Sequence, residues 1–359
     1  MLKYASAIWV AASLSGGCAS DDEAPQPCAR QTGHLCTGAA GTAGAAASPY
    51  SAPPVATDSS GAMTDGDHAA VGSGQALPPT GPTDSEDPAA GPNNMGGRSD
   101  DVSAHDCLAG IDPSIYASAG PLSYVERSHG SVTVFVPDVP AGCRVPVVHY
   151  ANGTNGTCAD NESILTHLAS HGFVAACYRS GKTGAGTQCI EAVETVLEQH
   201  ADVADETRVG FTGHSQGGRS AILCAYNAEQ SWGDARTLAV QAIEPSHWYG
   251  EGPRDYASLY AQIATPIFMF NGSRDTLVSA SRVRDGFDAL DGDLEAYWYE
   301  AIGASHVSPK PHEGWSNESA VAWFRWKLLG DMAACGHFAA LPNTNEWKLM
   351  DSQNTHPCQ

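Results

Sequence analysis

The chain has 359 residues and a formal net charge of −22, because 40 Asp and Glu residues outweigh 18 Lys and Arg residues. No basic stripe runs along the sequence, which argues against nucleic acid as a partner. The acidity itself is what a highly soluble surface needs and indicates no specific partner. The length predicts one large domain or two ordinary ones.

Residues 1–18 are typical of an export signal. Lys3 precedes a short apolar segment, Tyr4 to Leu14, which is too short to cross a bilayer, and small residues follow as far as Cys18. Two interpretations remain open. Signal peptidase could cut after the small residues and release a secreted protein. Alternatively, Cys18 could become the lipidated first residue of a lipoprotein that is anchored to the cell envelope.

Residues 19–106 are dominated by Ala, Gly, Pro, Ser, Thr and Asp, with almost no large aliphatic or aromatic side chain. Such a stretch cannot bury enough apolar surface to offset the entropy of ordering it, so we expect a disordered linker. It holds about a dozen acidic residues and only two basic ones, Arg30 and Arg98. A globular domain is expected over residues 107–359, which is long enough for one sizeable core.

The chain has 11 cysteines, and ten remain if Cys18 carries lipid. An even number in an exported chain predicts disulfides, whose connectivity the sequence does not determine. Local pairs are expected between Cys28 and Cys36 and between Cys335 and Cys358. An alternative interpretation of Cys177 and Cys224, which lie in apolar contexts, is that they are buried thiols. No Cys-x-x-Cys or His-Glu-x-x-His motif occurs, so no metal and no cofactor is expected.

Strand and helix patterns alternate along the globular region. Strands are expected over 131–137, 145–150, 173–178, 207–212, 237–243, 266–270 and 294–299. Helices are expected over 162–171, 189–200, 216–226, 281–290 and 317–329. Nearly continuous apolar strands between helices predict an α/β fold, with a mostly parallel central sheet flanked by helices on both faces. In such sheets, active sites lie at the carboxyl ends of the strands.

One of these strand-to-helix junctions carries the motif Gly213-His-Ser-Gln-Gly217. A serine between two glycines at such a junction is typical of a nucleophile elbow. The turn is so sharp that the serine is held in a strained backbone conformation and flanking side chains would collide, which explains both glycines. Ser215 is therefore the candidate nucleophile.

A serine hydroxyl needs a base to accept its proton, and a histidine oriented by a carboxylate is the usual base. In elbow enzymes the chain order is Ser, then an acid, then His. Asp275 follows the strand at 266–270, and His306 follows the last expected strand, so Ser215, Asp275 and His306 are the predicted triad. Glu244, at the end of the strand after the elbow helix, is the alternative acid. The competing candidates for the base are His149, His247 and His312.

A tetrahedral intermediate needs two N–H donors. One is expected from Gln216, the residue after the nucleophile. The other is expected from Thr154, because Gly153 allows a sharp turn after the strand at 145–150. The alternative is an ordinary glycine turn with no catalytic part.

At this level of detail the chain resembles the bacterial cutinase and polyester-hydrolase branch of the α/β-hydrolases. The motifs that carry the resemblance are Asn152-Gly-Thr154, Leu168-Ala-Ser-His-Gly-Phe-Val174, Gly213-His-Ser-Gln-Gly217, Asn271-Gly-Ser-Arg-Asp275 and Gly303-Ala-Ser-His306. The resemblance covers most of 107–359 and implies an α/β-hydrolase fold. In that family a tryptophan after the strand that follows the nucleophile lines the cleft, and Trp248 matches it, so the resemblance implies that Trp248 contacts the substrate. The alternative is a half-buried residue that only packs. The family commonly has an aromatic residue where Thr154 stands, so the amide role carries over and the aromatic clamp does not.

These observations predict an exported serine hydrolase that cleaves carboxylic esters through an acyl-enzyme intermediate. Its expected substrate is a small ester, a lipid or a polyester, and the enzyme is expected to act as a monomer. Two other functions remain open. One is an amidase or peptidase on the same fold, and the other is a tethered surface-binding protein with a decayed hydrolase fold.

Overall fold

The computed structural model describes residues 107–108, 111–181, 183–247, 254–307, 314–356 and 358. The expected signal and linker, together with Cys18, Cys28 and Cys36, lie outside these residues. So do Trp248 and His312. Within the part described, no helix is both long enough and apolar enough to cross a membrane.

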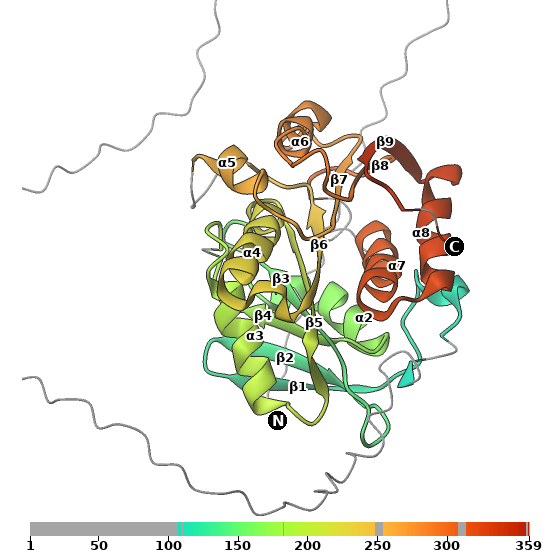
Figure 1. Cartoon of the computed structure of the whole chain (residues 1–359). Helices are drawn as coiled ribbons and strands as arrows, with labels where there is room; N and C mark the ends of the chain where they lie inside the picture. The colour runs from blue at the N-terminus through green and yellow to red at the C-terminus, as the bar shows by residue number, and fades with distance from the viewer. Residues whose placement is uncertain are drawn as a thin grey trace, which may run out of the picture. The chain divides into compact units, whose positions relative to one another are not determined.

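Nine strands form one sheet in the order β1-β2-β4-β3-β5-β6-β7-β8-β9 (Figure 1). In chain order the strands are β1 (Tyr124–His129), β2 (Val132–Pro137), β3 (Val145–Ala151), β4 (Val174–Tyr178), β5 (Ala204–His214), β6 (Thr237–Ile243), β7 (Ile267–Gly272), β8 (Ala296–Ala301) and β9 (Trp347–Gln353). The six central strands, from β4 to β8 in the sheet order, run parallel to one another. Antiparallel pairs join β1 to β2, β2 to β4 and β8 to β9.

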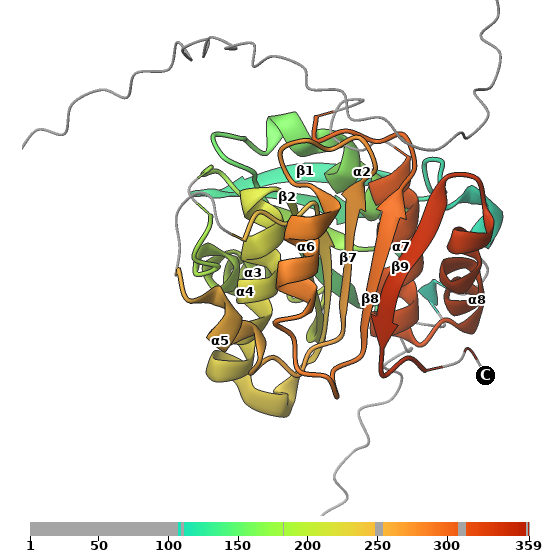
Figure 2. The ribbon, with the colours of Figure 1, turned by 90° about the horizontal axis from the view of Figure 1, so that it is seen from above.

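Helices cover both faces of this sheet. They are α2 (Glu162–Ser170), α3 (Gln188–Gln199), α4 (Gln216–Trp232), α5 (Tyr256–Tyr260), α6 (Ala280–Phe287), α7 (Trp315–Leu329) and α8 (Met332–Ala340). Short 3-10 turns lie at Pro113–Ile115, Ala159–Asn161, Gly233–Ala235 and Leu341–Asn343. Figure 2 shows α3, α4 and α6 on one side of the strands and α7 and α8 on the other. The fold is therefore α/β with a mostly parallel central sheet, which confirms the class predicted from the sequence.

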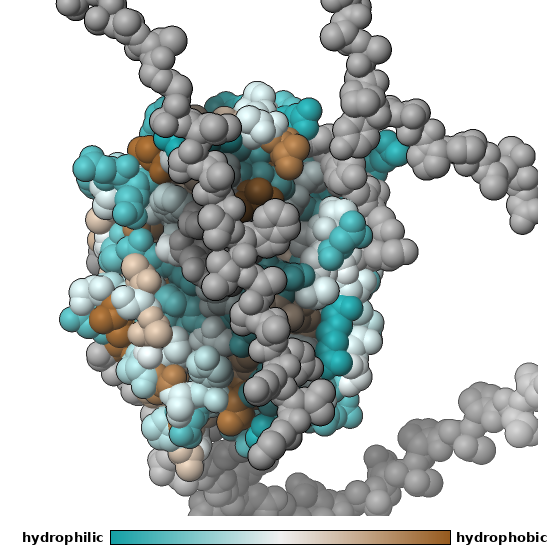
Figure 3. Space-filling view, turned by 180° about the vertical axis from the view of Figure 1, so that it is seen from behind, coloured by the Kyte–Doolittle hydropathy of each residue, from teal (hydrophilic) through white to brown (hydrophobic). Residues whose placement is uncertain are grey.

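Two apolar layers, one on each face of the sheet, follow from the twofold alternation of side chains along the strands. On β7, Ile267 and Met269 pack into the layer under α3, α4 and α6. Phe268 and Phe270 point the other way, into an aromatic-rich layer under α2, α7 and α8. Because both faces of the central strands pack against these layers, most of the buried residues in the strands are apolar. On the side of the described residues seen in Figure 3, hydrophobic residues lie scattered among hydrophilic ones.

Four disulfides cross-link the described residues. The pairs are Cys107–Cys143, Cys158–Cys177, Cys189–Cys224 and Cys335–Cys358. The predicted pair at the C-terminal end is thus confirmed. The interpretation of Cys177 and Cys224 as buried thiols is wrong. Both sulfurs are buried because they bridge neighbouring elements, α3 to α4 in the case of Cys224. Four disulfides indicate an oxidising compartment.

Candidate active site

Ser215 lies in the sharp turn between β5 and α4. Its backbone has φ 58° and ψ −120°, a conformation that L-residues adopt rarely. A Cβ on Gly213 would lie 2.5 Å from the carbonyl oxygens of Ala151 and Gly217, and one on Gly217 would lie 2.0 Å from that of Ala151. These backbone atoms cannot move away cheaply, so the glycines are required by the packing of α4 against β3.

The structure brings together the three side chains that the sequence singled out as a triad. His306 Nε2 lies 3.0 Å from Ser215 Oγ, and His306 Nδ1 lies 2.7 Å from Asp275 Oδ2. They meet because β5, β7 and β8 are parallel, so the loops that follow these strands share one edge of the sheet. The hydroxyl, the imidazole and the carboxylate form a continuous hydrogen-bonded line.

The carboxylate of Asp275 is held by the backbone of its own loop. Its Oδ1 accepts hydrogen bonds from the N–H groups of Leu277 at 2.8 Å and Val278 at 2.7 Å. Asp275 is 6% exposed, so its second oxygen, Oδ2, faces His306 without competition from bulk water. This arrangement fixes the orientation of the imidazole ring.

A second carboxylate, that of Glu244, reaches the same imidazole. Glu244 directly follows β6, is fully buried, and has its Oε2 3.3 Å from Nδ1 of His306. The sequence offered Glu244 as an alternative to Asp275. The structure places both at His306, with Asp275 closer.

Burial lowers the pKa of His306, but the hydrogen bonds and negative charges of Asp275 and Glu244 outweigh that effect and raise the pKa to about 9. An imidazole in this environment is therefore stabilised in its protonated form. That form is the one a general base reaches after accepting a proton.

His214 was not singled out in the sequence, although it lies beside the nucleophile in the motif. Its Nε2 lies 3.2 Å from Oε2 of Glu244, and its ring centroid lies 4.6 Å from that of His306. Position alone could have drawn attention to His214, but its link to Glu244 depends on the pairing of β5 with β6.

The two candidate oxyanion residues lie next to each other. Gln216 is the first residue of α4, where N–H groups point out of the helix end. The hydroxyl of Thr154 donates a 2.8 Å hydrogen bond to Oε1 of Gln216. The loop before Thr154 passes close to Ser215, since a Cβ on Gly153 would lie 3.7 Å from Cβ of Ser215. Thr154 and Gln216 therefore lie beside Ser215, where the sequence predicts the two N–H donors.

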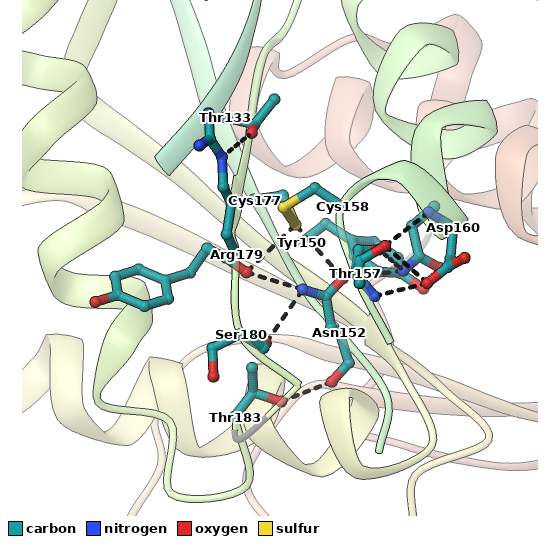
Figure 4. The surroundings of a disulfide bond; sticks show 12 residues. Thr133, Tyr150, Asn152, Thr157, Cys158, Asp160, Cys177, Arg179, Ser180 and Thr183 are labelled. Atoms are coloured by element: carbon teal, nitrogen blue, oxygen red, sulfur yellow. Dashed lines mark hydrogen bonds between the residues drawn. A yellow bond between two sulfur atoms is a disulfide. The ribbon is translucent and has the colours of Figure 1, made fainter. Parts of the chain in front are cut away.

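Asn152 anchors the start of the loop that carries Thr154, through the hydrogen bonds drawn in Figure 4. The Asn152 side chain is fully buried, donates to the carbonyls of Tyr178 at 2.8 Å and Ser180 at 3.2 Å, and accepts from Asn161 at 2.9 Å. Its backbone carbonyl accepts a 2.6 Å hydrogen bond from Thr183.

The Cys158–Cys177 disulfide ties the far end of the same loop to β4 (Figure 4). The loop leaves β3 at Ala151 and reaches Cys158 only seven residues later. Asn152 and the disulfide therefore restrain both ends of the segment that contains Thr154.

A cavity of about 690 Å³ opens above Ser215 and His306. Thr154 and His214 line it, and Leu277 and Val307 form an apolar part of its wall. Leu277 is 60% exposed and Val307 is 74% exposed. The volume lies in the range of ordinary small-molecule sites. A substrate with an apolar portion would cover these two side chains.

The other candidates do not join this constellation. His149 is buried in β3, and His247 is buried with its Nδ1 3.0 Å from the hydroxyl of Tyr260. Trp248, the expected substrate contact, and His312 lie outside the described residues.

Among the described residues, one group of three side chains brings potential metal ligands within 4.8 Å of one another, namely His214, Glu244 and His306. His306 would have to give up its bond to Asp275 to hold an ion there. We therefore interpret the group as a hydrogen-bonded network. A search of the chain against models of known protein families finds no match.

Proposed function

We propose that the protein is an exported serine hydrolase that cleaves carboxylic esters, built on an α/β-hydrolase fold. The single observation that carries the proposal is the line of contacts from Ser215 Oγ to His306 Nε2 and from His306 Nδ1 to Asp275 Oδ2, at 3.0 Å and 2.7 Å. Ser215 and His306 line a cavity large enough for a small molecule or a segment of a polymer chain.

The geometry supports a two-stage reaction. Ser215 Oγ attacks the ester carbonyl carbon while its proton passes to Nε2 of His306. The backbone N–H groups of Gln216 and Thr154 stabilise the oxyanion. The imidazolium then gives its proton to the leaving alcohol, which produces an acyl-enzyme. Water repeats the sequence with His306 as the base and releases the carboxylic acid. Asp275 keeps Nδ1 protonated throughout and stabilises the imidazolium.

Several features support an ester with an apolar portion as the substrate. The cavity wall contains exposed Leu277 and Val307 beside the nucleophile.

The disulfides support a site of action outside the reducing cytosol, whether the protein is secreted or anchored through Cys18. We propose lipids, polyesters or small esters as the substrate class and a monomer as the working form.

A fluorophosphonate probe and a series of p-nitrophenyl esters test the proposal together. The wild-type protein should react with the probe at Ser215 and hydrolyse the esters. Ser215→Ala should remain folded, lose labelling and lose roughly 10⁴-fold or more of the activity, because triad residues act as a unit. The matched control is Ser246→Ala. The backbone N–H of Ser246 donates to the carbonyl of Ser215, and alanine keeps that bond, so this variant should still react with the probe.

Three outcomes would reject the proposal. Unchanged ester turnover by Ser215→Ala would remove the assigned nucleophile. A wild-type protein that neither reacts with the probe nor turns over any ester would be a binding protein. Faster cleavage of a matched amide than of the ester would move the assignment to an amidase or peptidase.

A further inference from the structure

Two carboxylates converge on one imidazole nitrogen, although a catalytic triad requires only one. Asp275 Oδ2 lies 2.7 Å from Nδ1 of His306, and Glu244 Oε2 lies 3.3 Å from the same atom. Glu244 reaches this point from the end of β6, whereas Asp275 reaches it from the loop after β7.

Hydrogen bonds to the backbone of β7 hold Glu244 in place at the end of the sheet. Its Oε1 accepts a 3.0 Å hydrogen bond from the N–H of Gly272, and its own N–H donates to the carbonyl of Phe270 at 2.8 Å. A Cβ on Gly272 would lie 2.7 Å from Oε1, so the glycine leaves the space that the carboxylate fills. Glu244 also has φ 45°, an unfavourable backbone conformation for a side chain of this kind. Strained backbone conformations of this kind cluster at functional sites.

His214 completes the surroundings of this carboxylate. Its Nε2 lies 3.2 Å from the same Oε2 that approaches His306. Since an ionised carboxylate can only accept hydrogen bonds, both rings must present an N–H to it. Glu244 thus accepts from two imidazoles that flank the nucleophile, one on β5 and one after β8.

We propose that Glu244 is a positioning residue that acts through His306. It accepts part of the Nδ1–H hydrogen bond beside Asp275 and adds a second negative charge against the imidazolium that forms when Ser215 gives up its proton. This inference rests on the proposed ester hydrolysis. The proton remains on Nε2 until it passes to the leaving group, and neither carboxylate takes it.

The charged and titratable groups that face His306 agree with this role. Asp275 faces it from the loop after β7, Glu244 from the end of β6 and His214 from the end of β5. The pKa of His306 is raised to about 9 by both carboxylates together, against the effect of burial.

The first experiment measures the pKa of His306 by NMR, without relying on catalysis. In a Ser215→Ala background, the imidazole signal of His306 should titrate near pH 9. Adding Glu244→Gln should lower that pKa by about one unit or more, the usual effect of removing an opposite charge at this distance. Glu300→Gln removes a half-buried carboxylate at the end of β8 that bonds Asn271, and should leave the pKa unchanged. Equal pKa values with and without Glu244 would overturn the proposal.

The second experiment compares kcat for Asp275→Asn, Glu244→Gln and the double variant. Because Glu244 remains within reach of Nδ1, Asp275→Asn should lose only roughly 10- to 100-fold. The double variant should approach the roughly 10⁴-fold loss of a triad that has no carboxylate. If Asp275→Asn alone loses 10⁴-fold and Glu244→Gln adds nothing, Glu244 has no part in positioning.

If Glu244→Gln does not fold, Glu244→Asp replaces it. Its shorter carboxylate keeps the charge but cannot reach Nδ1, so Asp275→Asn/Glu244→Asp should lose as much activity as the double variant above. A protein with no esterase activity would reject the proposed function, while the NMR titration would still test whether Glu244 and His306 are coupled.

Discussion

The hydroxyl oxygen of Ser215 lies 3.0 Å from Nε2 of His306, although 91 residues of chain separate them. The hydroxyl can pass its proton to the imidazole only when Nε2 is neutral. Whether the site works at a given pH therefore depends on the protonation of His306, which two buried carboxylates favour.

Ester hydrolysis should rise with pH over the alkaline range. Because the pKa of His306 is raised to about 9, most of the free enzyme carries the inactive imidazolium below that pH. We expect kcat/KM to increase roughly tenfold per pH unit up to that point and then to level off. Initial rates on a neutral p-nitrophenyl ester from pH 6 to 10, corrected for buffer hydrolysis, measure this. A plateau already reached at pH 7 would contradict it.

Acid should destabilise the fold through His149. It is 1% exposed, and neither of its ring nitrogens has a hydrogen-bond partner among the described residues. Burial lowers its pKa from 6.5 to about 3, so the unfolded chain binds a proton more tightly than the folded one. The contribution of His149 to the free energy of unfolding is therefore fully present above pH 6.5 and is lost as the pH falls toward 3.

Between pH 7.5 and pH 5, His149 should lower the free energy of unfolding of the wild-type protein by about 2 kcal/mol, as linkage requires for these two pKa values. In His149→Leu the fall over the same pH range should be smaller by that amount. Urea unfolding at the two pH values measures the difference. His356→Gln changes an exposed histidine and should lose as much stability as the wild-type protein. An identical pH dependence in His149→Leu would show that His149 does not titrate in this way.

The Cys158–Cys177 disulfide should matter for catalysis as well as for stability. It holds the loop of Thr154, so Cys158→Ala/Cys177→Ala should lower kcat roughly 10- to 100-fold, less than the full loss of an oxyanion donor. The Cys335–Cys358 disulfide is the matched control. It joins residues 23 apart in the sequence, compared with 19 for Cys158–Cys177, and lies at the C-terminal end of the chain. Removing either pair should lower the free energy of unfolding by about 3 kcal/mol. Removing the C-terminal pair should leave kcat unchanged. Equal effects on kcat would refute the role of the loop.

Replacing glycine by alanine should have opposite effects on stability in the turn around Ser215 and in an ordinary helix. Gly217→Ala would place a Cβ 2.0 Å from the carbonyl oxygen of Ala151, so it should cost about 3 kcal/mol or more and abolish activity. Gly336 lies in α8, and a Cβ added there would meet nothing within 4 Å beyond the backbone of its own helix. Gly336→Ala should therefore stabilise the protein by about 0.5–1 kcal/mol. Unfolding curves for both variants check the opposite signs.

The central part of the fold could be predicted from the sequence because its elements have clear periods. β7 is a nearly continuous apolar run and α3 shows one apolar face, so their ranges agree closely with the structure. β5 runs from Ala204 to His214, beyond the expected 207–212, because the residues after Ala204 are polar and partly exposed. β1 was not predicted. All six of its residues are exposed or half-buried, as suits an edge strand, and the sequence YVERSH has no apolar stripe. β9 and α8 were missed for the same reason, because neither has a clear amphipathic pattern.

Chain order and strand ends could predict Ser215, Asp275 and His306, since elbow sites follow a fixed order. They could not predict that Glu244 would share the nitrogen of His306 with Asp275. That contact depends on the lateral pairing of β6 with β7 and on the positive φ of Glu244. The disulfide partners of Cys158 and Cys189 could not be predicted either, because disulfides depend on which elements lie side by side and not on the spacing of cysteines in the sequence.

The Cys107–Cys143 bridge has a mechanical consequence for any chain that is held at its amino end. Cys143 lies two residues before β3, and β3 is hydrogen-bonded on both sides, to β4 and β5. Tension applied ahead of Cys107 bypasses β1 and β2, which lie inside the closed covalent loop, and loads the middle of the sheet. Pulling out such a strand requires many hydrogen bonds to shear at once, whereas an outermost strand would peel away one bond at a time.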